Sequence, residues 1–247
     1  AHTIRTSNIN MNVTMTGYHL LKYANDNMNY TGNLSNDLPL FRLAEIYLNY
    51  AEAKAELGTL TQTDIDNTIN RLRTRAGVTG KLNMNKANQN PDPYMCDSKT
   101  GYVNVTGDNK GVILEIRRER AIELVMEGFR YYDLMRWKEG QCIAQSFQGF
   151  YLPATAINKA YDIDGDGTND VCFYTTSSQP NVGSMTYVKL ASDGSGTSLS
   201  EGNYGNLLCY SWIDRTWNEE RDYLYPIPRQ EITLSDGIVT QNPGWNE

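Results

Sequence analysis

The stretch from Lys110 to Gly140 constrains the fold of this chain more than any other, because it predicts one long amphipathic helix. No proline interrupts it, and its apolar residues recur mostly at spacings of three or four, or at multiples of these. These apolar positions are Ile113, Ile116, Leu124, Phe129, Tyr132 and Met135. At a rise of ~1.5 Å per residue, such a helix would span roughly 40 Å, which is wider than a small domain. Other parts of the chain must therefore pack along it.

Charged residues of both signs alternate on the polar side of this stretch. Four pairs stand three positions apart, where helical side chains meet: Glu115/Arg118, Arg120/Glu123, Glu127/Arg130 and Asp133/Arg136. Glu123 and Glu127 could form an acid/base pair, or the arginines could clamp an anion. Alternating charge along a helix is more typical of an ion-paired or solvated face. We therefore expect these residues mainly to hold helices together.

Two shorter helices are predicted before this stretch. The first begins near Pro39 and ends at Gly58, with an apolar face made by Leu40, Leu43, Tyr47, Tyr50, Ala51 and Ala53. The second covers 64–76, with Thr61 or Thr63 as its cap, Gly77 as its stop, and Ile65, Ile69 and Leu72 as core positions. Together they predict a helical hairpin like those of tetratricopeptide repeats, although no strict 34-residue repeat is present.

The fold class predicted from these patterns is mainly α, with tetratricopeptide-like hairpin packing, long irregular loops and a few short strands. The helical core should cover residues 38–77 and 110–140 approximately. Residues 79–109 predict a long surface loop that packs few side chains. Residues 141–222 form a loop-rich region with short strands at 171–174 and 187–190, and we expect function there because binding residues often lie on loops.

Composition excludes several functions. A net charge of −7 and a pI near 5.0 argue against a nucleic-acid partner, whose phosphates require clustered Lys and Arg. No apolar run approaches the ~20 residues needed to cross a bilayer, and the N-terminus has no charged-then-apolar leader. The four cysteines form no close pair typical of zinc or redox sites, and the two histidines, His2 and His19, lie in no recognisable motif. Disulfides remain possible, but the sequence does not pair them.

The segment 162–170, DIDGDGTND, predicts a calcium loop. Carboxylates stand at loop positions one, three, five and nine, a glycine stands at the sixth, and the seventh residue can add a carbonyl oxygen. The proposed ligands are Asp162, Asp164, Asp166, Thr168 and Asp170. The segment departs from an EF-hand because position twelve is Phe173 and no helix pattern flanks it. The alternative is an acidic turn that binds no metal.

Aromatic residues near the end of the loop-rich region are candidates for ligand binding. A sugar presents aliphatic C–H faces that pack on aromatic rings, and its hydroxyls require polar neighbours. The candidates are Tyr204, Tyr210, Trp212 and Trp217, with Asn203, Asn206, Asp214, Arg215 and Asn218 nearby. For any single ring, packing against the helices is the more strongly expected role, since large aromatics are highly buried on average.

Three stretches in order resemble the SusD/RagB-like outer-membrane nutrient-binding proteins: 41–58, 117–140 and 223–245. The resemblance implies that residues 1–247 are the C-terminal portion of such a protein, with a C-terminal signature over 223–247. A signal peptide, a lipid-bearing cysteine and an N-terminal helical-repeat half would then be absent. It also implies a surface lipoprotein of the outer membrane, not an enzyme, that captures glycans and delivers them to a SusC-like TonB-dependent transporter. The family fixes no glycan-binding residues that could be assigned here.

Two other functions stay open from the sequence. A glycoside hydrolase requires two carboxyl groups that face one site ~5–9.5 Å apart. Its candidates are Asp214, Glu219, Glu220 and Asp222, which lie close to the aromatic residues. A scaffold that binds no glycan is the remaining alternative.

Overall fold

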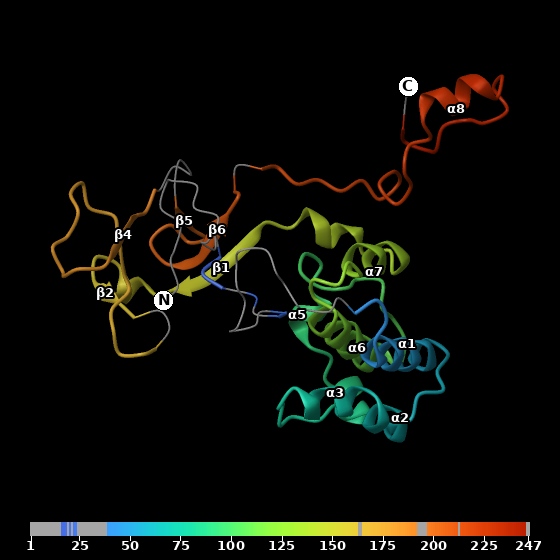
Figure 1. The fold of residues 1–247 in the computed structure, drawn as a ribbon, viewed down its shortest axis with the longest axis horizontal. Coiled ribbons are helices and arrows are strands. Elements are labelled where there is room, and N and C mark those ends of the chain that lie inside the picture. Colours follow the sequence, from blue (N-terminus) through green and yellow to red (C-terminus); the bar gives the residue numbers. More distant parts are fainter. Residues whose placement is uncertain are drawn as a thin grey trace. The chain divides into compact units, whose positions relative to one another are not determined.

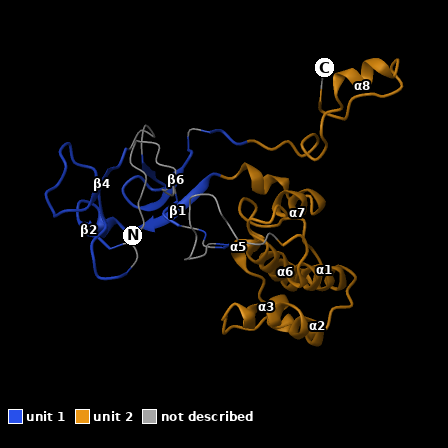
Figure 2. Cartoon of the chain, viewed as in Figure 1, with its two compact units in different colours: residues 1–24, 146–215 blue, residues 25–145, 216–247 orange. Residues whose placement is uncertain are grey.

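The computed structural model describes residues 16–18, 20, 22–23, 39–162, 165–191, 197–211 and 213–245. The chain forms two compact units, which are described separately (Figure 2). Unit 1 comprises residues 1–24 and 146–215, and unit 2 comprises residues 25–145 and 216–247. None of the helices in the described part of the chain combines the length and the apolar character that a bilayer crossing requires.

Unit 2 contains the described α-helices (Figure 1). They are α1 (Leu43–Glu56), α2 (Gln62–Asn67), α3 (Ile69–Arg75), α4 (Met84–Gln89), α5 (Pro93–Cys96), α6 (Lys110–Glu123), α7 (Arg130–Arg136) and α8 (Arg229–Leu234). A 3-10 helix, η1 (Gly140–Ala144), follows α7. Helix α6 is central, because α1 and α4 both pack against it, and α3 contacts α1. The predicted helical core is confirmed, whereas tetratricopeptide-like packing stays a prediction.

The prediction of one helix over 110–140 is wrong, because the helix stops at Glu123 and resumes at Arg130. Two residues in the gap have left-handed backbone, Met126 with φ 64° and Gly128 with φ 81°. Glycine adopts this conformation without steric cost, so Gly128 permits the break. The apolar spacing continues across the gap and hides the interruption from a periodicity argument.

The predicted apolar face of the first helix is also wrong in part. Leu40, Leu43 and Tyr50 are exposed, at 81%, 60% and 46%. Helix α1 instead buries the positions Ala44, Leu48, Ala51, Glu52 and Ala55. Helix α1 packs against α6, and this packing decides which face of α1 is covered. The predicted stop at Gly58 is confirmed, with φ 68°.

The second predicted helix has the expected cap and core but is broken. Thr61 begins α2 with a capping box, in which its hydroxyl accepts the N–H of Asp64 and the Asp64 carboxylate accepts the N–H of Thr61. Thr68 has φ −123° and ψ −87° and separates α2 from α3. Ile65, Ile69 and Leu72 are all buried, as predicted.

The prediction that residues 79–109 pack few side chains is wrong. Helices α4 and α5 lie in this segment, and four of its residues belong to the core of unit 2: Leu82, Met95, Tyr102 and Val105. The Asn and Asp residues that suggest a loop act partly as helix caps. Asn83 accepts the N–H of Lys86 at 3.0 Å, and Asp92 accepts the N–H of Tyr94 at 2.8 Å.

Unit 1 contains two small sheets (Figure 1). The first has the strand order β1-β6-β5 and is antiparallel, and the second has the order β2-β3-β4, with β3 and β4 parallel. The strands are β1 (Phe147–Leu152), β2 (Ala160–Tyr161), β3 (Val171–Tyr174), β4 (Thr186–Lys189), β5 (Ser198–Leu199) and β6 (Gly205–Cys209), and the 3-10 helix η2 is Ala154–Ala156. The strand predicted at 171–174 is confirmed, and β4 starts one residue before the second predicted strand.

A separate hydrophobic core holds unit 1 together. It includes Phe150 and Phe173, whose ring centroids are 5.7 Å apart. Strand β1 shifts register between Gln148 and Tyr151, and Gly149 lies in this irregularity. A Cβ on Gly149 would stand 2.5 Å from the carbonyl oxygen of Thr16, so only glycine fits this approach. All four cysteines of the chain carry free thiols.

Candidate functional site

The charges of α6 and the following gap pair mainly with other elements. The Arg42 guanidinium donates to both oxygens of Glu127, at 2.7 and 2.6 Å, and also pairs with Glu123. Arg75 donates to Glu123 at 2.6 Å. Burial alone would raise the pKa of Glu123, but the hydrogen bonds from Arg75 and Arg42 outweigh it and lower that pKa. The prediction that these residues hold helices together is confirmed, and a general-acid role for Glu123 loses support.

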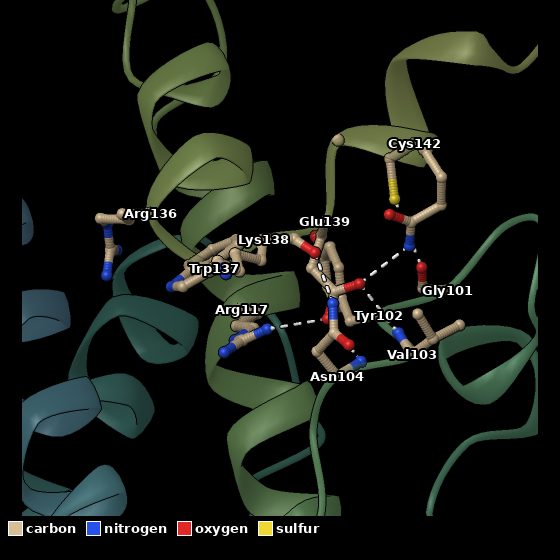
Figure 3. A network of polar contacts seen from close by, with 12 residues as sticks. Gly101, Tyr102, Val103, Asn104, Arg117, Arg136, Trp137, Lys138, Glu139 and Cys142 are labelled. Atoms are coloured by element: carbon tan, nitrogen blue, oxygen red, sulfur yellow. Dashed lines mark hydrogen bonds and ion pairs between the residues drawn. The ribbon is translucent and has the colours of Figure 1, made fainter. Parts of the chain in front are cut away.

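A buried carboxylate, that of Glu139, connects the end of α7 to the loop that contains Val103 and Asn104 by hydrogen bonds (Figure 3). It is fully buried, at 0% exposure. It accepts the backbone N–H groups of Val103 and Asn104, each at 2.9 Å, and the side-chain amide of Gln141 at 2.8 Å. The Arg117 guanidinium lies 3.4 Å away. With four donors around it, this carboxylate has a structural role.

A second buried carboxylate, Glu52 of α1, joins α1 to α7. It accepts from Arg136 at 2.7 Å and from the indole N–H of Trp137 at 2.6 Å. Burial would raise the pKa of Glu52, but the hydrogen bonds from Arg136 and Trp137 outweigh it and keep that pKa below its ordinary value. The Arg117 guanidinium lies 4.5 Å from the centroid of the Trp137 ring. These contacts also explain the charge pattern as a scaffold.

The aromatic residues predicted to bind ligand are divided between the two units. Tyr204 lies between β5 and β6 and is 41% exposed, while Tyr210 follows β6 with φ 56° and is half-buried. Trp217 belongs to unit 2 and packs edge-to-face on Tyr223, with ring centroids 5.0 Å apart. Trp212 lies outside the described residues. The structure therefore places Tyr204 and Tyr210 in unit 1, at opposite ends of β6, and Trp217 in unit 2.

Trp217 lies against the start of η1. A Cβ added to Gly140 would stand 2.0 Å from the Trp217 ring, so the absence of a side chain there makes room for the indole. The Tyr223 hydroxyl accepts the N–H of Gly140 at 3.0 Å and donates to Glu219 at 2.9 Å. This packing corresponds to the structural role that the sequence left open for Trp217. Its ligand role stays a prediction.

The first sheet of unit 1 presents an aromatic and amide surface to which Tyr151, a residue that the sequence analysis missed, contributes. Tyr151 of β1 is 55% exposed and pairs in register with Asn206 of β6, so the two side chains share one face. The Asn206 amide donates to the carbonyl of Gly149 at 2.9 Å, which fixes its orientation. Leu152 pairs with Gly205, so Tyr204 lies at the same end of the strand pair as Tyr151. The available signal for this surface was Tyr151, an exposed aromatic residue between the buried residues Phe150 and Leu152.

The acidic loop curls around its first residue. Asp162 accepts the N–H of Gly165 at 2.7 Å and that of Gly167 at 2.8 Å, and Asp166 accepts the N–H of Thr168 at 2.7 Å. Asp164 lies outside the described residues. Within the part of the chain that the structure describes, no three His, Cys, Asp or Glu side chains are arranged to hold a metal. The calcium site, including Asp170, stays a prediction.

The carboxylates considered for hydrolysis are also divided between the units, with Asp214 in unit 1 and the others in unit 2. Asp222 accepts from Arg221 at 2.5 Å and from the N–H of Asn218 at 2.8 Å. These two bonds lower the pKa of Asp222, so this group is ionised at neutral pH. A general acid requires a raised pKa, and Asp222 does not provide one.

Comparisons with known proteins identify the family. A sequence profile of the SusD family matches residues 2–245. The comparison with curated proteins gave no match. Among solved structures, the chain is similar to a SusD-like protein from Bacteroides fragilis NCTC 9343, with 24% identity, a TM-score of 0.43, and coverage of 82% of this chain and 24% of that one. The chain thus spans about a quarter of that relative. Because the family profile matches nearly the whole sequence, this chain belongs to the SusD family.

Proposed function

We propose that this chain is part of a cell-surface glycan-binding protein that serves nutrient uptake. The observation that carries the proposal is the SusD family match over residues 2–245. In this proposal the protein binds an oligosaccharide or polysaccharide without hydrolysing it. A lipid anchor holds it to the outer membrane, and a SusC-like TonB-dependent transporter receives the glycan.

The proposed binding surface lies on the first sheet of unit 1. Tyr151 and Tyr204 offer exposed rings at one end of the β1–β6 pair, and Asn206 offers an oriented amide next to Tyr151. A sugar ring can stack its C–H face on an aromatic ring while its hydroxyls bond to an amide, which suits this combination. Tyr210 follows β6 at the other end of the strand pair, and together with Trp212, the next aromatic residue in the sequence, it forms a separate part of the proposed set.

A structural Ca²⁺ in the 162–170 loop is a further part of the proposal. Asp162 and Asp166 would supply carboxylate oxygens, and the carbonyl of Thr168 a further oxygen, the ligands that Ca²⁺ prefers. The N–H groups of Gly165 and Gly167 both donate to the Asp162 carboxylate, which supports a loop that turns around its first proposed ligand. Its role would be to order this loop of unit 1.

The test is a glycan array on the intact protein, followed by calorimetric titration of the best ligand with four variants. Tyr151→Ala, Tyr204→Ala and Trp212→Ala should each weaken binding about 2- to 10-fold, the effect of losing one stacked ring. Tyr94→Ala is the matched control, because Tyr94 is 64% exposed and lies in unit 2. Products released from any bound glycan would support the hydrolase alternative. An array without any bound glycan would refute the proposal and favour a scaffold.

A further inference from the structure

The break between α6 and α7 encloses a hollow of about 420 Å³ in unit 2. Its lining is mainly apolar and aromatic, with charged groups among the lining residues. The lining includes Arg120, Leu124, Met126, Phe129, Arg130 and Tyr131. This volume lies within the range of pockets that hold small organic ligands, ~300–1,000 Å³. The hollow belongs to unit 2 alone.

Three tyrosines form a cluster, and one of them, Tyr131, lines the hollow. The Tyr131 ring lies 5.6 Å from that of Tyr132, edge-on, and 6.4 Å from that of Tyr225. Tyr132 and Tyr225 are 68% and 69% exposed, whereas Tyr131 is 36% exposed. A hydrogen bond with Tyr225, together with burial, raises the pKa of Tyr131 to about 12. The cluster therefore combines the exposed rings of Tyr132 and Tyr225 with the hydrogen-bonded hydroxyl groups of Tyr131 and Tyr225.

The charged residues of the hollow are balanced. Arg120 and Asp133 are almost fully buried and pair at 2.7 Å, and the Arg120 guanidinium lies 5.5 Å from the Phe129 ring centroid. Arg130 is exposed and donates to the hydroxyl of Tyr102 at 2.6 Å. The carboxylate of Asp222 lies close enough to Tyr131 to affect its ionisation. This mixture of signs disfavours a strongly charged ligand and leaves hydroxyl and guanidinium donors at the rim.

The backbone at the rim is in a costly conformation. Met126 lines the hollow with φ 64°, and its side chain is 62% exposed. Non-glycine residues in this region are uncommon and concentrate at ligand sites, where the surrounding structure retains them. A flexible apolar methionine side chain is also suited to cover ligands of varied shape. Met126 and Tyr131 thus line the same hollow.

We propose that the hollow between α6 and α7, together with the tyrosine cluster that Tyr131 joins to its wall, is a second saccharide site. In it a neutral sugar ring stacks on Tyr132 or Tyr225, beside the hollow, and hydrogen-bonds to Tyr131 and Arg130. The inference rests on the proposed function, since it assigns the same ligand class to a separate place in the other unit. The C–H side of the sugar ring stacks on the aromatic faces, and its oxygens form hydrogen bonds with the hydroxyl and guanidinium groups. A neutral sugar fits because the charges of Arg120 and Asp133 are already matched.

The experiment uses the full chain and four neutral probes: cellohexaose, maltohexaose, mannohexaose and xylohexaose. Each is titrated calorimetrically against wild type, Tyr132→Ala, Tyr225→Ala, Tyr225→Phe and the control Tyr94→Ala. For the probe that binds, Tyr132→Ala or Tyr225→Ala should weaken binding about 3- to 10-fold, Tyr225→Phe should weaken it less because the ring remains, and Tyr94→Ala should have no effect.

A footprint provides a readout that does not depend on variants. Tetranitromethane nitrates exposed tyrosines, and mass spectrometry reports each site. The bound probe should protect Tyr132 and Tyr225 and leave Tyr94 reactive. Equal nitration with and without probe, or variants at Tyr132 and Tyr225 that behave like Tyr94→Ala, would overturn the site. If Tyr204→Ala still weakens binding in that case, the proposed function stands without this second site. If no probe or array glycan binds wild type, both proposals fail.

Discussion

Replacing Glu139 by alanine should unfold unit 2 more easily than any exposed charge change, because its carboxylate is fully buried. The substitution leaves the N–H groups of Val103 and Asn104 without their acceptor. A hydrogen bond to a charged group contributes ~1.5–3 kcal/mol, so two lost bonds predict a loss of about 3–6 kcal/mol in the free energy of unfolding. Glu139→Gln keeps one carbonyl acceptor and should lose about half of that.

The control is Glu56→Ala, which removes the other carboxylate partner of Arg117. That contact is 3.3 Å long, and the Glu56 side chain is 48% exposed, so its loss should cost ~0–1 kcal/mol. Urea unfolding followed by far-UV circular dichroism measures the three variants, because the described α-helices lie in unit 2. Hydrogen exchange of the amides at 103 and 104 gives a local readout, and both should exchange faster in Glu139→Ala.

Two results would refute this reasoning. Equal stability losses from Glu139→Ala and Glu56→Ala would mean that burial of the carboxylate does not control its contribution. Unchanged exchange at 103 and 104 in Glu139→Ala would mean that the two amides have other acceptors in solution.

Three further predictions concern pH, packing and metal. The folded-state pKa of Glu52 lies below its ordinary 4.5, so its contribution is present above pH 4.5 and is lost as the pH falls from there through the folded pKa; Glu52→Gln should flatten that acid loss in unfolding curves recorded at successive pH values. Trp217→Ala should lower the free energy of unfolding by about 2–4 kcal/mol, because the partly buried ring packs on Tyr223. Glycan affinity measured by calorimetry should stay unchanged. Weaker binding with full stability would contradict the structural role of Trp217. Calcium should raise the thermal midpoint of wild type but not of Asp162→Ala, and a wild-type midpoint indifferent to chelator and calcium would count against the metal site.

Local signals predicted the parts of unit 2 that depend on neighbouring residues. The cap at Thr61 and the stops at Gly58 and Gly77 follow from hydrogen bonds and backbone angles within a few residues. The core positions Ile65 and Ile69 follow from helical spacing, and both have 0% exposure. The cap and the stops depend on local contacts, and the spacing depends on the order of residues, so both can be read from the sequence.

The errors arose where tertiary packing decided between local alternatives. Apolar residues occur on both sides of α1, and α6 covers the side with Ala44 and Leu48 while Leu43 stays exposed. The helix over 110–140 breaks because Met126 and Gly128 take left-handed backbone, although the apolar spacing alone would continue. Periodicity shows where apolar residues stand along a helix, but it does not show which neighbouring element covers them.

The candidate sites were the least predictable part, because they are assembled from distant segments. Tyr151 gains its amide neighbour only when β1 pairs with β6 and brings Asn206 opposite it. Tyr131 and Tyr225 meet because the segment after Trp217 returns to α7. In the sequence these residues are isolated tyrosines among the seventeen of the chain. Composition indicated the type of residue, and topology alone selected which of them share a surface.

The pairing of charges in unit 2 bears on the ligand proposed for it. Glu123 already accepts from two arginines, and Glu52 from Arg136 and Trp137, so a charged ligand would have to replace bonds that also join the helices. A neutral ring that stacks on an exposed tyrosine breaks no ion pair. The stacking also removes apolar surface from water. Selection for a stable ion-paired helical unit and recognition of neutral saccharides by aromatic residues are therefore compatible in one chain.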